Sequence, residues 1–94
     1  MITMNSKNIT KENELVEKYM RVAIEEAKIA KDAGENPFGA VLLDSNYNFC
    51  HKAHSRSIEL SDPTAHAEVL VIREYCQEHK KIYLKDYILI CSGE

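Results

Sequence analysis

The sequence predicts a single layered α/β domain, and three observations lead to this prediction. The chain has 94 residues, which is enough for one domain. Hydrophobic residues make up 45% of it and charged residues 29%, a composition that fits a packed core and excludes a disordered or collagen-like chain. Patterns typical of helices and strands follow one another in the order helix, strand, strand, helix, strand.

The first half of the chain predicts a helix followed by a hairpin. Apolar residues within 14–33 recur at the spacing of one helix face, and Gly34 is a typical residue just beyond a helix end. Residues 38–43 form a continuous apolar run, which is typical of a central strand covered on both faces. The polar residues 44–48 predict a turn, so residues 49–54 are expected to return as an antiparallel strand.

The second half predicts another helix and a third strand after a polar loop at 55–61. Asp62 and Pro63 have the form of a helix N-cap and a first-turn proline, and the helix is expected to run to about residue 78. Its middle is apolar on nearly all sides, which suits a helix packed against the sheet under another layer. Residues 87–91 predict a third buried strand.

Charge and hydropathy limit the partners of the chain. The formal net charge is −3, and lysines and arginines are interleaved with acids, which disfavours nucleic acid as a partner. No apolar run approaches the roughly 20 residues that a membrane helix needs. Residues 1–13 lack the apolar core of a secretion signal and are expected to be a flexible segment. We therefore expect a cytoplasmic protein without a membrane partner.

Three cysteines, Cys50, Cys76 and Cys91, are present. Their number is odd and no C-x-x-C spacing occurs, so neither a disulfide framework nor a self-contained zinc knuckle is indicated. We expect all three to be buried free thiols.

His66 and Glu68 are the candidate residues for chemistry. They combine a common metal ligand with a carboxylate that can carry protons, and a bound metal lowers the pKa of water towards about 7. Spacing alone does not show that they cooperate, because residues two apart on a helix point about 200° away from each other. A capping histidine beside an exposed glutamate stays open as the alternative.

Two longer motifs give this pair a context. Residues 36–43 read Asn-Pro-Phe-Gly-Ala-Val-Leu-Leu, and residues 62–68 read Asp-Pro-Thr-Ala-His-Ala-Glu, followed by Ile72 and Arg73. They resemble the first-strand motif and the zinc-site helix of the zinc-dependent deaminase superfamily, which includes cytidine, deoxycytidylate and guanine deaminases and tRNA adenosine deaminases. The resemblance covers most of residues 15–94 and implies a cytidine deaminase-like α-β-α fold.

The resemblance also implies roles for individual residues. His66 would be a zinc ligand, and Glu68 would carry the proton from zinc-activated water to the base. The Ala67 backbone amide and Phe38 would line the base pocket, although a role for Phe38 as a core aromatic is equally open. The implied reaction is a hydrolytic deamination that uses zinc and releases ammonia.

Two departures from the family pattern stand out. Ser55 occupies a position where the family commonly has a substrate-contacting asparagine, and its hydroxyl has less reach than an amide, so base binding is expected to be weakened or altered. The family takes its other two zinc ligands from a P-C-x-x-C motif after the third strand, and this motif does not occur here. Residues 14–94 are therefore expected to be the N-terminal part of a deaminase domain, inactive as a monomer.

The expected substrate is a purine base or nucleoside. The motif wording resembles guanine and general nucleoside deaminases more than cytidine enzymes, and a tRNA adenosine deaminase is an alternative because those enzymes share the wording. A competing hypothesis is a catalytically dead fragment or an association module. Exposed strand edges and apolar faces favour self-association, so we expect a homo-oligomer.

Overall fold

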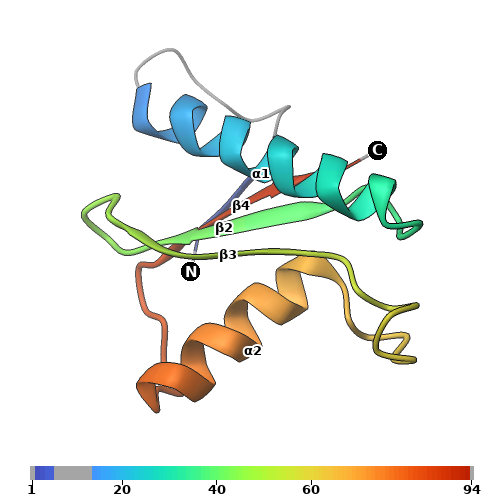
Figure 1. Cartoon of the computed structure of the whole chain (residues 1–94). Helices are drawn as coiled ribbons and strands as arrows, with labels where there is room; N and C mark the ends of the chain where they lie inside the picture. The colour runs from blue at the N-terminus through green and yellow to red at the C-terminus, as the bar shows by residue number, and fades with distance from the viewer. Residues whose placement is uncertain (1, 6–13, 94) are drawn as a thin grey trace.

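One four-stranded sheet lies between two helices, α1 on one face and α2 on the other (Figure 1). The computed structural model describes residues 2–5 and 14–93. The layered arrangement and the order helix, strand, strand, helix, strand from residue 14 onwards confirm the predicted fold class. The elements are β1 (Ile2–Asn5), α1 (Glu14–Asp32), β2 (Gly39–Leu43), β3 (Phe49–His54), α2 (Ala67–His79) and β4 (Ile88–Ser92).

The strand order is β1-β4-β2-β3, which places β2 inside the sheet as predicted. It runs antiparallel to both neighbours, so that Leu42 lies opposite His51 of β3 on one side and Leu89 of β4 on the other. All five residues of β2 are buried. A strand that is paired on both edges and covered on both faces exposes neither its backbone nor its side chains to water.

The strand β1 was not predicted. Residues 1–13 are expected from the sequence to be flexible, yet Ile2–Asn5 pair in parallel with β4, from Ile2 opposite Ile88 to Asn5 opposite Cys91. A strand of four residues is too short to show a pattern, and its pairing partner lies at the other end of the chain. Residues 1 and 6–13 of the expected flexible segment lie outside the described residues.

The first helix ends as Gly34 predicts. This glycine has a φ of 81°, its N–H donates to the Lys31 carbonyl at 3.0 Å, and the Glu35 N–H donates to the Ala30 carbonyl at 2.9 Å. These two bonds form a Schellman motif, which satisfies carbonyls that the helix itself leaves free. The chain can therefore turn sharply from α1 into the segment that leads to β2.

The core has two parts because side chains of β2 alternate between the two faces of the sheet. Val41 and Leu43 pack on the α1 side, whereas Ala40 and Leu42 pack on the α2 side. The other buried residues of the α1 side are Val16, Met20, Ala23, Ile88 and Ile90, and those of the α2 side are Ala53, Ala65, Ala67, Leu70, Val71, Tyr75 and Leu89. Both faces therefore exclude water, which explains the continuous apolar run in the sequence.

The start of α2 differs from the prediction. The helix begins at Ala67, and His66, in an extended conformation, is its N-cap in place of Asp62. The Asp62 carboxylate instead accepts hydrogen bonds from the Thr64 N–H at 2.8 Å and the Thr64 hydroxyl at 2.7 Å. An aspartate that bonds a backbone amide two residues on can close a turn or begin a helix, so the local sequence fits both. The helix ends at His79, close to the predicted end.

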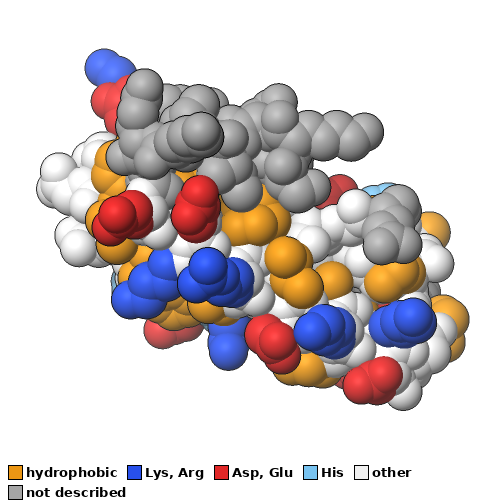
Figure 2. All heavy atoms as spheres, turned by 90° about the horizontal axis from the view of Figure 1, so that it is seen from above, with side chains coloured by type: hydrophobic (Ala, Val, Ile, Leu, Met, Phe, Trp, Pro, Cys, Tyr) orange, Lys and Arg blue, Asp and Glu red, His pale blue; other side chains and the backbone are white. Residues whose placement is uncertain are grey.

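The cysteines and the surface charges agree only in part with the sequence predictions. Cys50, Cys76 and Cys91 are free thiols as predicted, but all three are only half-buried. Figure 2, seen from the α1 side, shows acidic and basic side chains interleaved with exposed hydrophobic ones. Within residues 2–5 and 14–93, no helix has the length and apolarity needed to cross a membrane.

A substitution at Gly39 can test how closely α1 packs on the sheet. A Cβ at this position would lie 2.0 Å from the Ala23 carbonyl oxygen and 2.7 Å from the Ala27 nitrogen, both in the backbone of α1. Gly39→Ala should therefore force α1 away from β2 and lower the free energy of unfolding by about 2 kcal/mol. Urea unfolding monitored by circular dichroism measures this change. Leu15→Ala, at a side chain that is 44% exposed, is the control and should change little, and equal midpoints for the two variants would contradict the prediction.

Candidate active site

A small hollow of about 190 Å³ lies where the entry to β2 meets the beginning of α2. It is lined by Asn36 and Phe38 from the first segment and by His66 and Glu68 from the second. The structure thus brings together three residues that the sequence singled out, although their two segments are distant in the chain. Asn36 was missed as a lining residue, and the only signal for it was its place at the start of the first-strand motif.

The side chains of His66 and Glu68 converge at this hollow. His66 Nδ1 lies 3.4 Å from Glu68 Oε1, and both side chains are about half exposed. Because His66 has φ −78° and ψ 153°, it is not part of the helix, and the 200° divergence of helical neighbours does not apply to the pair. His66 makes no side-chain cap, which argues against the alternative of a capping histidine.

The beginning of α2 contributes a positive electrostatic potential, which favours negative charge at the hollow. The first backbone N–H groups of a helix have no partner within the helix and carry partial positive charge. Glu68 lies in this first turn, where its negative charge is stabilised. The Ala67 side chain is buried in the core, so only the backbone of this residue is available to a ligand.

Ser55 is buried behind the residues that line the hollow. Its N–H donates to the Phe38 carbonyl at 3.1 Å, and the next N–H, of Arg56, donates to the Ala65 carbonyl at 2.9 Å. Ser55 is therefore held between the two segments that form the site. Its side chain is 2% exposed, and within the described part of the chain its Oγ has no hydrogen-bond partner. A buried hydroxyl without a partner is costly, so this atom is available to a water molecule or a ligand group.

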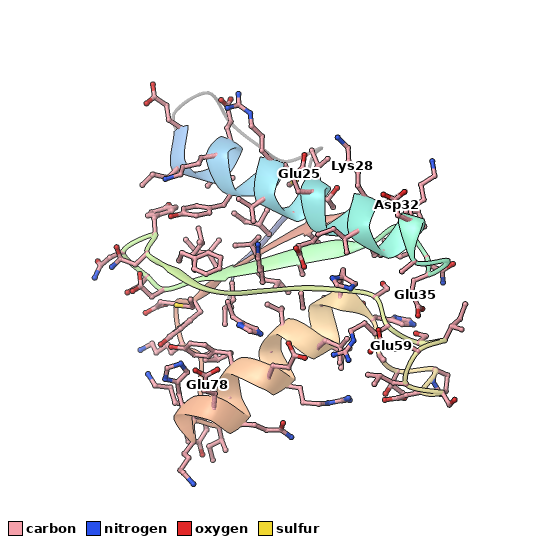
Figure 3. The ribbon with its side chains drawn as sticks, viewed as in Figure 1. Glu25, Lys28, Asp32, Glu35, Glu59 and Glu78 are labelled. Atoms are coloured by element: carbon pink, nitrogen blue, oxygen red, sulfur yellow. The ribbon has the colours of Figure 1, made fainter. Side chains whose placement is uncertain are left out.

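The loop 55–61 beside the site is held by a buried carboxylate. Glu35 accepts hydrogen bonds from the Ile58 N–H at 2.9 Å and the Glu59 N–H at 2.8 Å. Figure 3 shows Glu35 and Glu59 at the same end of the molecule, where the chain enters β2 and α2 begins. This bidentate contact ties the loop to the end of α1.

Cys91 of β4 is electrostatically coupled to Glu68. Burial, with a smaller contribution from the negative charge of Glu68, raises the pKa of the Cys91 thiol to about 11. The thiol is therefore neutral at neutral pH. Metals bind the thiolate form of cysteine, so the neutral Cys91 thiol is a poor metal ligand. It packs against the core on the α2 side, as the sequence predicted, but is only half-buried.

The described residues fit one part of a zinc site. Within residues 14–93 and 2–5, no group of three or more histidine, cysteine, aspartate or glutamate side chains could hold a metal ion. A catalytic zinc takes three protein ligands and leaves a fourth position for water. The half-exposed imidazole of His66 offers one ligand, with a carboxylate beside it.

The strand β3 carries three further residues of metal-ligating types, Cys50, His51 and His54, but they do not form a metal site. His51 Nε2 lies 2.8 Å from a carboxylate oxygen of Glu74 in α2, whereas His54 Nδ1 lies 3.0 Å from a carboxylate oxygen of Glu26 in α1. The two imidazoles thus point to opposite helix layers. These pairs tie β3 to both helices and do not converge on one point.

Comparison with known proteins identifies the family. Residues 13–94 match the family described as the cytidine and deoxycytidylate deaminase zinc-binding region. The chain belongs to this family. Zinc is the cofactor of these deaminases, in agreement with the expectation from the motifs.

Individual relatives narrow the comparison. A tRNA-specific adenosine deaminase of Aquifex aeolicus is 44% identical over 69 residues, which cover 73% of this chain and 45% of that protein. A solved structure from studies of A-to-I editing by tRNA:A34 deaminases matches with a TM-score of 0.76 and 35% identity, over 80% of this chain and 57% of that one. Guanine deaminase from Bacillus subtilis matches with a TM-score of 0.68 and 31% identity, over 88% and 50%. The chain thus spans about half the length of these relatives.

The coupling between Cys91 and Glu68 can be measured by alkylation. Because the pKa of Cys91 is about 11, its rate of reaction with iodoacetamide should rise roughly tenfold per pH unit between about pH 7 and pH 10. Glu68→Gln removes a negative charge that raises this pKa, so it should lower the pKa and speed the reaction at each pH. Peptide mass spectrometry follows the modification, with Glu78→Gln as the control. A rate that levels off near pH 8.5 would contradict the prediction.

Proposed function

We propose that this chain carries the histidine and glutamate part of a zinc-dependent deaminase that converts adenosine in tRNA to inosine. The observation that carries the proposal is the convergence of His66 and Glu68 at a hollow lined by an aromatic ring and an amide. A metal ligand, a proton carrier and a surface for a planar base are the groups that hydrolytic deamination of a nucleobase requires.

Each residue has a role in this proposal. His66 is one of three protein ligands of zinc, and the family takes the other two from a P-C-x-x-C motif, which the 94 residues do not contain. Zinc, when bound, acts as a Lewis acid that lowers the pKa of a water molecule towards about 7. Glu68 is not a ligand: its carboxylate accepts a proton from the attacking water and delivers it to the base, so that ammonia can leave.

The remaining residues hold the base. The Phe38 ring packs against it, and the Ala67 N–H at the beginning of α2 donates a hydrogen bond to it. Ser55 contributes its unpartnered hydroxyl, through a water molecule where direct reach is too short. Because Ser55 is almost fully buried, this contact orders the wall of the pocket more than it anchors the substrate directly.

Two observations favour adenosine in tRNA over a free base. Among the solved structures, the tRNA:A34 deaminase matches with a higher TM-score and identity (0.76 and 35%) than guanine deaminase (0.68 and 31%), and a tRNA-specific adenosine deaminase is 44% identical over 69 residues. In addition, Lys80, Lys81 and Lys85 are exposed in the same short segment as Tyr83, a residue that is 80% exposed. Cations beside an exposed aromatic ring suit a nucleic acid, although the chain as a whole is acidic. A cytoplasmic location is part of the same proposal.

The second candidate is an association module without activity. It is supported by the lack of a three-ligand metal group among the described residues and by an apolar hollow of about 410 Å³ beside the exposed Ile82 and Tyr83. The same surface, together with the free edge of β3, supports self-association into a homo-oligomer.

The proton-carrying role of Glu68 is tested in a protein that joins this chain to a P-C-x-x-C segment and is loaded with zinc, with an anticodon stem-loop that contains adenosine as substrate. Wild-type protein should form inosine, and Glu68→Gln should lower the rate by about 100-fold or more with unchanged zinc content, because only the proton carrier is removed. Nucleoside mass spectrometry measures inosine, and metal analysis measures zinc. Glu78→Gln, on an exposed glutamate near the other end of the same helix, is the matched control and should keep full activity (Figure 3).

The outcomes separate the candidates. Turnover retained by Glu68→Gln would contradict the role of Glu68 as proton carrier. Deamination of free guanine but not of the stem-loop would indicate that the substrate is a free purine base. Absence of both stoichiometric zinc and turnover, with a stable homo-oligomer in sedimentation, would favour the association module.

The exposed lysines make a further prediction about substrate binding. Changing Lys80 and Lys85 together to glutamine should weaken binding of the stem-loop and reduce its dependence on salt, because fewer counterions are released. Fluorescence anisotropy at several salt concentrations measures both effects. Lys28 and Lys31, two exposed lysines on α1, provide the control pair when changed to glutamine. Equal loss of affinity in the two double variants would contradict a binding surface at residues 80–85.

A further inference from the structure

The loop of residues 62–66 is bonded to the second turn of α2, and we propose that Asp62, Thr64 and Arg73 form a clamp that positions the His66 imidazole against Glu68. None of these three residues lines the hollow. They are positioning residues that act through the backbone of the loop. The inference rests on the proposed function for its chemical meaning, but the orientation of His66 can be measured without metal or substrate.

The clamp consists of four hydrogen bonds. Asp62 Oδ1 accepts from the Thr64 N–H at 2.8 Å and from the Thr64 hydroxyl at 2.7 Å. The Arg73 guanidinium donates through Nη1 to Asp62 Oδ2 at 3.5 Å and through Nη2 to Thr64 Oγ1 at 3.4 Å. The flat guanidinium therefore spans two acceptors at once, which a lysine ammonium does not do in the same way.

Helix geometry explains why Arg73 reaches this loop. Seven residues separate it from His66, close to two turns of a helix, so its side chain starts on the same side of α2 as the N-cap. The loop consequently folds back along the helix. Backbone bonds hold its other side, because the Asp62 N–H donates to the Ser57 carbonyl at 3.0 Å and the Ala65 carbonyl accepts from Arg56.

The clamp selects one of two local structures that the sequence allows. Asp62 followed by Pro63 also fits an N-cap, from which the helix would include His66 and turn its ring about 200° away from Glu68. In the observed turn, the bonds from Arg73 stabilise Asp62 and Thr64 in the non-helical arrangement, and His66 stays extended. The 3.4 Å approach of His66 Nδ1 to Glu68 Oε1 depends on that choice.

The charge state of Asp62 suits this role. Hydrogen bonds from the Thr64 hydroxyl and N–H, with a smaller contribution from Arg73, hold the pKa of the Asp62 carboxyl below its usual value. The carboxylate is therefore ionised at neutral pH and keeps its interaction with the guanidinium. Because the folded-state pKa is lowered, the stabilisation is present at neutral pH and is lost only as the pH falls through that lowered value.

The experiment follows the His66 side chain by NMR in the full chain without metal. Arg73→Gln, which removes the guanidinium but keeps a polar side chain, and Thr64→Val, which preserves side-chain size, should shift the His66 ring signals. Both should weaken the nuclear Overhauser effect between the His66 ring and the Glu68 side chain at least twofold. The Thr64 amide should exchange with solvent about tenfold faster. Arg73→Lys should restore part of the wild-type pattern, because an ammonium can still pair with Asp62. Arg21→Gln, on an exposed arginine of α1, is the control and should leave the His66 signals unchanged.

Two results would overturn the inference: wild-type His66 signals in both Arg73→Gln and Thr64→Val, or equal changes in Arg21→Gln. If Arg73→Gln fails to fold, Asp62→Asn decides the question, because it keeps the Oδ1 acceptor for Thr64 and weakens only the pairing with Arg73. The two proposals fail separately. Displacement of His66 in the variants, together with an absence of deaminase activity in zinc-loaded protein that also contains a P-C-x-x-C segment, would support the clamp and contradict the proposed function.

Discussion

The burial of β2 is the constraint on which the rest of the structure depends. This strand pairs with β4 and β3 on its two edges and is covered by α1 and α2 on its two faces. The lack of a side chain at Gly39 lets α1 approach closely at the point where β2 begins. Backbone bonds of Ser55 and Arg56 then connect the segment just before the strand to the segment that leads into α2. The hollow with Phe38 on one wall and His66 on the other is a consequence of that packing.

One side of the site is held by hydrogen bonds between its segments, whereas the other side depends on the backbone conformation of His66. The Ser55 N–H donates a hydrogen bond to the Phe38 carbonyl, which connects the segment after β3 to the segment before β2. The Glu35 carboxylate accepts two hydrogen bonds from the adjoining loop. His66 is different, because its extended conformation outside the helix decides whether its ring meets Glu68. The proximity of His66 and Glu68 fits the family to which the chain belongs, because in a zinc-binding deaminase a metal ligand and a proton carrier must face the same base.

Much of the fold could be read from the sequence because its elements have strong local patterns. The amphipathic helix ending before Gly34, the continuous apolar run of β2 and the return of β3 were all predicted with nearly the observed bounds. The strand β1 was missed because four residues that pair with a distant strand leave no local pattern. The predicted start of α2 was wrong because an aspartate such as Asp62 can begin a turn as readily as a helix. Here the turn is also bonded to Arg73, which lies two turns into the helix.

For the candidate site, the sequence by itself determined which residues are available: an imidazole and a carboxylate two residues apart, in motifs that resemble those of zinc-dependent deaminases. It also determined that the 94 residues contain no C-x-x-C pair. Only the tertiary structure decided that His66 and Glu68 face each other, that Asn36 joins them, and that the buried Ser55 hydroxyl has no hydrogen-bond partner among residues 2–5 and 14–93. The physical reason is that side-chain direction depends on backbone conformation, and the conformation of His66 is set by contacts with residues that local sequence patterns do not connect.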